Sequence, residues 1–63
     1  MGRAKKPDWR VEVSLEKVGG KPRYLWRAVD AAGEVLDFYA TATRTEADEG
    51  AALRFLTQAL KGR

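Results

Sequence analysis

The residue types that carry most enzyme chemistry are scarce in this chain of 63 residues. It has no histidine and no cysteine, so the commonest general base, the commonest metal ligand, the thiolate and the disulfide are all excluded. Ser14 therefore lacks the histidine that would activate a serine nucleophile. Gly19-Gly20 is followed by neither a Lys-Ser/Thr pair nor a helix, and is typical of a hairpin turn rather than a phosphate-binding loop. Carboxylates and basic side chains are the remaining candidates.

Basic side chains are concentrated in the first part of the chain. Residues 1–27 hold eight Lys/Arg and three Asp/Glu, a net charge of +5, whereas residues 28–63 have a net charge of −2. Such a basic region can attract nucleic acid, or it can be a solvated tail followed by ordinary strand-surface charges. The candidate nucleic-acid-binding residues are Arg3, Lys5, Lys6, Arg10, Lys21, Arg23 and Arg27.

Alternating apolar and polar residues predict three strands, at about 9–18, 23–30 and 34–42. The first alternates strictly, and the second is apolar on both faces, which is typical of a central strand. In the third, one face is expected to carry Leu36, Phe38 and Ala40, and the other Val35, Asp37, Tyr39 and Thr41. Gly19-Gly20 and Asp30-Ala31-Ala32-Gly33 are the predicted hairpin turns.

A helix is predicted after the strands. Thr45 and Asp48 fit a capping box, and the helix is expected to continue to about Lys61, with Gly62 as a C-terminal cap. The expected fold is α+β: a three-stranded antiparallel β-meander followed by one C-terminal helix (β-β-β-α). Residues 1–8 are expected to be a flexible basic tail and residues 9–63 a single domain.

Six aromatic side chains could form the core, contact another protein or stack on nucleic-acid bases. Because so small a chain has little else to bury, Trp26, Phe38 and Phe55 are expected in the core. The candidate intermolecular contacts are Trp9, Tyr24, Trp26 and Tyr39.

The central hairpin sequence also resembles a known family. The resemblance is carried by Tyr24 to Asp30 (Tyr-Leu-Trp-Arg-Ala-Val-Asp), a short turn, and then Gly33-Glu34-Val35-Leu36-Asp37. These residues resemble the integrase-core region of DDE transposases from bacterial insertion sequences. In that family the run follows a strand of the form Trp-x-Val-Asp-Glu-Thr-Tyr, a Lys-Val pair and a Gly-Lys turn. The matching segments here are Trp9 to Leu15 and Lys17 to Lys21, and a basic helix containing Ala51 to Leu56 follows.

The resemblance implies the first part of a ribonuclease H-like core, in which three carboxylates hold two divalent metal ions. Glu12 lies at the position that resembles the first of these carboxylates, where the family has Asp, and its extra methylene would misplace a metal ion. The positions of the second and third carboxylates lie beyond the helix in that family. Asp30 is expected to be a turn residue and Asp37 a solvated strand residue. No catalytic residue, metal site or cofactor is therefore predicted.

The sequence thus predicts a non-catalytic remnant of a transposase core that forms a homodimer. One alternative is a small nucleic-acid-binding module that binds DNA weakly through the basic residues. The other is a protein-interaction module that pairs with itself or with a full-length transposase. Without a membrane-spanning run or a secretory signal, a cytoplasmic location is expected, and no small-molecule substrate is evident.

Overall fold

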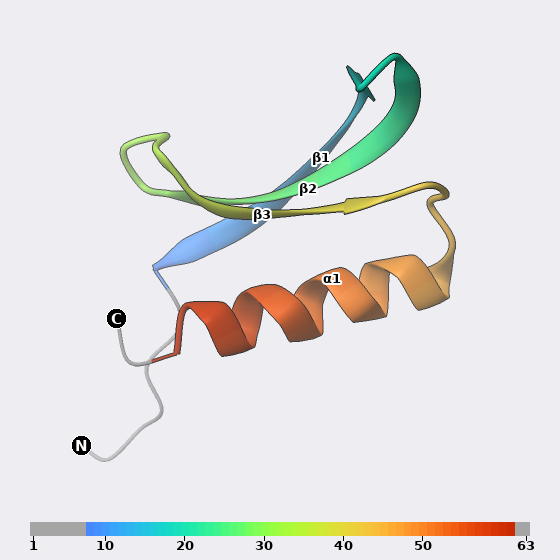
Figure 1. Cartoon of the computed structure of the whole chain (residues 1–63). Coiled ribbons are helices and arrows are strands. Elements are labelled where there is room, and N and C mark those ends of the chain that lie inside the picture. Colours follow the sequence, from blue (N-terminus) through green and yellow to red (C-terminus); the bar gives the residue numbers. More distant parts are fainter. Residues whose placement is uncertain (1–7, 62–63) are drawn as a thin grey trace, which may run out of the picture.

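A computed structural model describes residues 8–61. The elements follow the order β1 (Trp9–Val18), β2 (Lys21–Asp30), β3 (Val35–Thr41) and α1 (Glu46–Ala59). The strands form one antiparallel sheet in the order β1-β2-β3, and α1 lies against one face of it (Figure 1). The predicted β-β-β-α fold is confirmed.

The hairpin that joins β1 to β2 turns at Gly19 and Gly20, whose φ angles are +60° and +82°. Two consecutive positive φ angles make a type I′ turn, which matches the right-handed twist of the flanking strands and suits glycine. The strand register then runs without a break from Val18 opposite Lys21 to Trp9 opposite Asp30. β2 therefore begins two residues earlier than the sequence predicted.

Asp30 closes the second turn with its side chain. Its Oδ1 accepts hydrogen bonds from the backbone N–H groups of Ala32 and Glu34, each at 2.9 Å, and Gly33 takes a φ of +86°. An aspartate carboxylate that bonds the backbone two residues ahead is a standard turn device. The predicted role of Asp30 as a turn residue is confirmed.

A β-bulge at Leu36 changes the predicted faces of β3. Ala28 lies opposite Asp37 and Val29 opposite Val35, so that Leu36 is an extra residue between the two pairs. Leu36 consequently packs against the core together with Tyr39, whereas Phe38 is 57% exposed. The prediction that Leu36 and Phe38 share a face was wrong, because strict alternation assumes a strand without a bulge.

The capping box at the start of α1 is present as predicted. The backbone N–H of Asp48 donates to Thr45 Oγ1 at 3.1 Å, and the backbone N–H of Thr45 donates to Asp48 Oδ2 at 3.0 Å. The helix ends at Ala59 with Leu60 as its C-cap, two residues before the predicted end. The predicted cap Gly62 lies outside the described residues.

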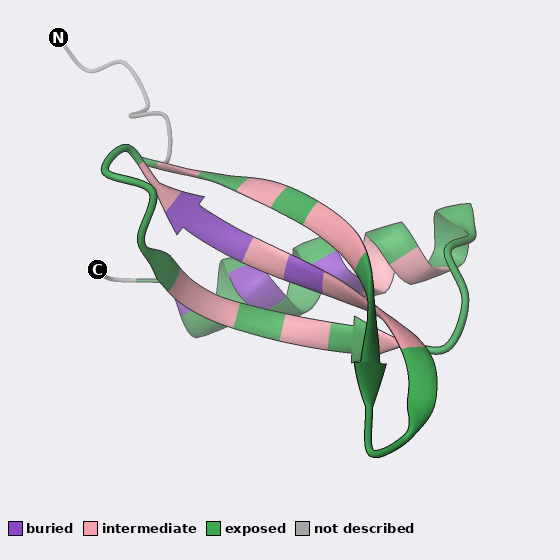
Figure 2. Cartoon of the chain, turned by 90° about the horizontal axis from the view of Figure 1, so that it is seen from above, coloured by how far each residue is buried: buried purple, intermediate pink, exposed green. Residues whose placement is uncertain are grey.

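The core lies between β2 and one stripe of α1. Its buried members are Trp26, Ala28, Ala52, Leu56 and Leu60. The last three are spaced four residues apart, so they form one line along the helix, and the small side chains of the two alanines let helix and sheet approach closely. Figure 2 shows buried segments, in purple, on the middle strand and on the helix. The backbone of α1 lies nearest to that of β3, while its buried side chains reach Trp26 and Ala28 of β2.

The aromatic residues only partly follow the core prediction. Trp26 is 4% exposed, and its Nε1 donates a hydrogen bond to Thr41 Oγ1 at 2.8 Å. The expectation that Phe38 and Phe55 are core residues was wrong, since they are 57% and 42% exposed. Phe55 lies beside the buried line of α1, and its ring instead stacks at a tilt on Tyr39, with ring centroids 4.9 Å apart.

Candidate functional site

Glu12 lies in the middle of β1 on the face of the sheet that α1 does not cover. Its neighbours Val11 and Val13 pack against the core, so strand alternation directs Glu12 to the opposite face. Arg27 of β2 is its cross-strand partner, and Phe38 of β3 follows Arg27 in the same row. We call this uncovered side of the sheet the open face.

Two arginines occupy the surroundings of Glu12. Arg10 Nη2 lies 2.9 Å from Glu12 Oε2, with 60% of the arginine side chain and 47% of the glutamate side chain exposed. Arg27 donates from Nη2 to Ser14 Oγ at 2.9 Å, and its Nη1 lies 4.0 Å from Glu16 Oε2. Ser14 Oγ in turn donates to Glu16 at 3.0 Å. These residues form two polar clusters on the open face: Arg10 with Glu12 on β1, and Arg27 of β2 with Ser14 and Glu16.

These two clusters do not fit a divalent-metal centre. Two-metal catalysis needs carboxylate oxygens that converge on the ions, but the carboxylate of Glu12 is bonded to the Arg10 guanidinium, and Arg27 occupies the position opposite Glu12 on β2. Among residues 8–61 no group of three His, Cys, Asp or Glu side chains is placed to hold a metal ion. Ser14 is likewise held between Arg27 and Glu16 rather than beside a histidine.

The two other candidate carboxylates lie elsewhere. Asp30 is committed to its turn by two backbone hydrogen bonds. Asp37 lies opposite Ala28, whose side chain is in the core, so it belongs to the side of the sheet that α1 covers, away from Glu12. Its Oδ1 accepts from the backbone N–H of Phe38 at 2.8 Å. The structure does not bring either aspartate to Glu12.

The predicted nucleic-acid-binding residues divide into two groups. Arg3, Lys5 and Lys6 lie outside the described residues. Strand alternation places Arg10, Lys21, Arg23 and Arg27 together on the open face. Glu12 and Glu16 lie between these four basic side chains, so the open face has mixed charge rather than a continuous basic stripe.

The four predicted interface residues lie on the covered side of the sheet. Trp26 is buried in the core, and Trp9, Tyr24 and Tyr39 are partly buried against it. The expectation that Trp26 is available for an intermolecular contact is therefore wrong for the folded chain, because α1 packs directly over it. The apolar residues that alternation leaves for the open face are Leu25, Val29, Val35, Phe38 and Ala40, of which Val29 is itself buried.

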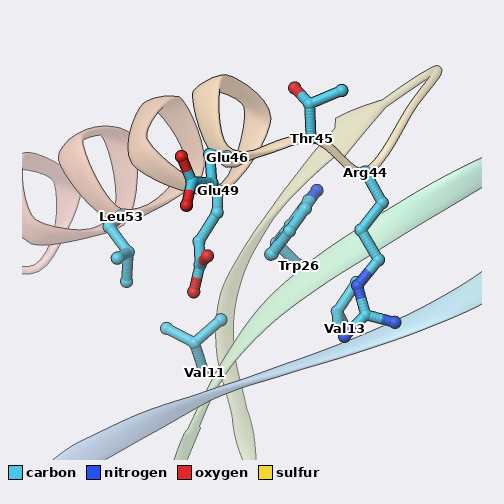
Figure 3. A pocket seen from close by; sticks show the side chains of 8 residues that line it. All are labelled: Val11, Val13, Trp26, Arg44, Thr45, Glu46, Glu49 and Leu53. Atoms are coloured by element: carbon cyan, nitrogen blue, oxygen red, sulfur yellow. The ribbon is translucent and has the colours of Figure 1, made fainter.

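A groove between β1 and the start of α1 was not predicted. It has a volume of about 320 Å³. Its apolar lining residues are Val11, Val13, Trp26 and Leu53, and its polar lining residues are Arg44, Thr45, Glu46 and Glu49 (Figure 3). The groove exists because the backbone of α1 lies nearest to β3, on the far side of β2 from β1, and leaves the apolar side of β1 partly uncovered. The sequence gives one signal for this groove: apolar and polar residues alternate along β1 over a longer stretch than one helix can cover.

Comparison with known proteins identifies the family. A family profile described as a DDE domain, of the IS240 transposase type, matches residues 6–63. Searches of curated proteins and of solved structures gave no match. Within the described part of the chain, no helix is long and apolar enough to cross a membrane. The matched range contains all four elements of the fold, and the β-β-β-α order is consistent with part of a ribonuclease H-like core. The chain therefore belongs to the DDE domain family of transposases.

Proposed function

We propose that this chain is a non-catalytic remnant of a transposase core, which acts by associating with other chains through its sheet. The observation that carries the proposal is the set of basic neighbours of Glu12. At the position that resembles the first metal-binding carboxylate, the side chain is a glutamate bonded to Arg10, with Arg27 as its cross-strand neighbour. Cations at these neighbouring positions disfavour the binding of a divalent cation, since like charges repel at short range.

The test of the non-catalytic role is an assay for magnesium- or manganese-dependent cleavage of DNA that carries insertion-sequence ends. The wild-type protein is expected to leave this DNA intact. The Glu12→Asp variant, which restores the residue type of the family, is expected to be inactive as well because both arginines remain. Metal-dependent cleavage by either protein would contradict the proposal.

Self-association is supported by the incomplete covering of the sheet. α1 covers one face only, and the open face carries Val35 and Phe38 with 51% and 57% of their surfaces exposed. The long strand β1 lies at an edge of the sheet. Exposed apolar groups and unpaired strand edges are the usual features of protein–protein contacts.

Sedimentation over a wide range of protein concentration tests this part of the proposal. A homodimer is expected, and its dissociation on dilution should be nearly independent of salt, because the contact is mainly apolar and main-chain in character. A folded species of 7.0 kDa at every concentration would argue against self-association. Complex formation with a full-length transposase, measured in the same way, would indicate the interaction-module alternative.

Weak DNA binding is the second candidate, favoured by the alignment of Arg10, Lys21, Arg23 and Arg27 on one face. The affinity for duplex DNA should then fall with the logarithm of salt concentration, because bound counterions are released. Replacing Lys21 and Arg23 by alanine should weaken binding equally for all sequences, whereas Arg54→Ala, an exposed change on α1, is the matched control.

The basic residues outside the described range supply a second arm of the DNA-binding test. Replacing Arg3, Lys5 and Lys6 together should also weaken binding for all sequences alike. A strong preference for one DNA sequence that survives both sets of changes would show that binding is not electrostatic.

A further inference from the structure

The two edges of the sheet are not equivalent. β3 is seven residues long, carries a bulge and has α1 packed against it. β1 is ten residues long, and its register with β2 is unbroken. Within residues 8–61 no strand pairs with the outer side of β1. A long and regular free edge is a template for another strand, and nothing in β1 such as a proline or a bulge prevents pairing.

The first hairpin turn determines which backbone groups point to this free edge. In a two-residue turn the closing residues Val18 and Lys21 form a hydrogen-bonded pair, and hydrogen-bonded pairs then alternate along the ladder. The even-numbered residues of β1 therefore bond to β2, while the N–H and C=O groups of the odd-numbered residues point outward. The position of Pro22 opposite Lys17 agrees, since proline has no N–H for this ladder.

Except for Lys17, the same odd-numbered residues carry apolar side chains, and these are not fully covered. Leu15 is 59% exposed, and Val11 and Val13 line the groove beside α1. Leu53, on the helix side of the groove, is 40% exposed. A strand added to the edge of β1 would bring its own side chains next to these residues, and so would satisfy the outward backbone groups and the apolar surface together.

We propose that this strand is β1 of a second copy, paired antiparallel so that Val13 faces the partner's Val13 across a two-fold axis. The inference rests on the self-association proposed above and names its contact and register. In this register Arg10 lies opposite the partner's Glu16, and Val11 opposite the partner's Leu15. These two pairs each occur twice, as the symmetry requires, whereas the Val13 pair lies on the axis and occurs once.

Charge decides against the adjacent registers. Moving the axis to Glu12 would place Glu12 opposite the partner's Glu12, and moving it to Ser14 would place Glu12 opposite the partner's Glu16. Moving the axis to Val11 would leave Leu15 beyond the paired segment, and moving it to Leu15 would leave Arg10 unpaired. The axis at Val13 pairs the strand from Trp9 to Lys17, all but its last residue, and brings no like charges together.

The resulting dimer has one six-stranded antiparallel sheet with an α1 helix near each outer edge. On the side of the sheet that α1 covers, the partner's Leu15 lies beside Val11 and extends the apolar surface at the groove between β1 and α1. On the open face, Arg10 and the partner's Glu16 meet. Both edges of the sheet are then β3 strands, which are short and bulged, so the assembly stops at two copies.

Single-cysteine variants test the register, because the natural chain has no cysteine of its own. Val13→Cys places two thiols in a hydrogen-bonded pair with Cα atoms about 5.5 Å apart, within reach of a disulfide. Leu15→Cys is the matched control. In this register the two copies of residue 15 are offset by four residues along the strands, about 13 Å, which is too far for a disulfide. Oxidation should therefore convert Val13→Cys into a covalent dimer and leave Leu15→Cys mostly monomeric.

An equimolar mixture of Val11→Cys and Leu15→Cys, one of them carrying a mass tag, is the second arm of the test. The mixed disulfide should form in large excess over either homodimer, and this arm does not depend on a change at Val13. Cross-linking of Leu15→Cys alone as fast as Val13→Cys would overturn the register. A dimer in sedimentation that gives neither the Val13 nor the mixed cross-link would overturn edge pairing while leaving self-association intact. A monomer at every concentration would overturn both.

Discussion

Glu12 and its two arginines show how neighbouring residues set the chemistry of one position. A carboxylate on a regular strand is a suitable metal ligand only if its oxygens are free to converge with others. Here Arg10 is 2.9 Å away on the same strand, and Arg27 is the cross-strand neighbour. The exposed Arg10–Glu12 pair contributes only about 0.2–1 kcal/mol to stability, so its main effect is on which ions the position can bind.

Asp48 is a residue whose charge supports the local fold. Its Oδ2 accepts hydrogen bonds from the Thr43 hydroxyl, from the Thr45 backbone N–H at 3.0 Å and from the Thr45 hydroxyl at 2.8 Å. These bonds, that from the Thr43 side chain first, favour the charged form and lower the pKa of Asp48. The lowered pKa couples the start of α1 to pH.

We predict that Asp48→Asn reduces the free energy of unfolding near neutral pH and has a smaller effect in acid. A group with a lowered folded pKa contributes stability above its unfolded pKa, about 3.9, and loses that contribution as pH falls through the folded value. Urea unfolding of both proteins between neutral pH and acid checks this. Glu46→Gln, in the same helical turn, controls for the loss of one negative charge. A constant difference between wild type and Asp48→Asn at all pH values would contradict the prediction.

At the scale of elements, the position of α1 decides which surfaces of the sheet remain free. The residues of α1 that pack on the sheet are Ala52, Leu56 and Leu60, and they lie over β2 and β3. β1 therefore keeps a free edge and a partly uncovered apolar side, at the groove lined by Val11 and Val13. The element that carries Glu12 is thus also the element best placed for a contact with another chain.

Proline substitutions distinguish the two sides of β1. Leu15→Pro should leave the fold intact and prevent dimerisation, because the side chain is exposed and the outward N–H serves only the partner strand. Ser14→Pro should unfold the domain or destabilise it by about 3 kcal/mol or more, because that N–H bonds to β2. Circular dichroism and sedimentation of both variants measure these effects. A Leu15→Pro variant that is folded and still dimeric would show that the contact lies elsewhere.

At the scale of the whole molecule, one helix and three strands leave a small core with five clustered members. Domains of about 60 residues bury only about 60% of the surface that the unfolded chain exposes, and without disulfides or metals they often gain stability from association. Dimerisation through β1 would add buried apolar surface and backbone hydrogen bonds to this core. Folding and association are then thermodynamically linked.

We predict that the thermal midpoint of unfolding rises with protein concentration, because mass action favours the folded dimer over unfolded monomers. Differential scanning calorimetry at several concentrations checks this, and the folded Leu15→Pro variant serves as the monomeric control. A midpoint that is independent of concentration in the wild type would mean that association contributes nothing to stability.

Local backbone structure was predictable from the sequence alone, because each feature depends on a few adjacent residues. Gly19-Gly20 determines a two-residue turn, Asp30 and Gly33 determine the second turn, and Thr45 with Asp48 determines the start of α1. The alternation of the first strand and the β-β-β-α order follow from the same kind of local signal, and the family resemblance follows from the residues themselves.

Only the tertiary structure decided which apolar residues are buried. A bulge at Leu36 turned Phe38 to the open face, and the line of α1 that packs on the sheet excluded Phe55. Both outcomes depend on contacts between segments far apart in sequence, which side-chain patterns within one segment do not specify. The placement of α1 over β3 likewise created the groove and left β1 free, since one helix is too narrow to cover three strands.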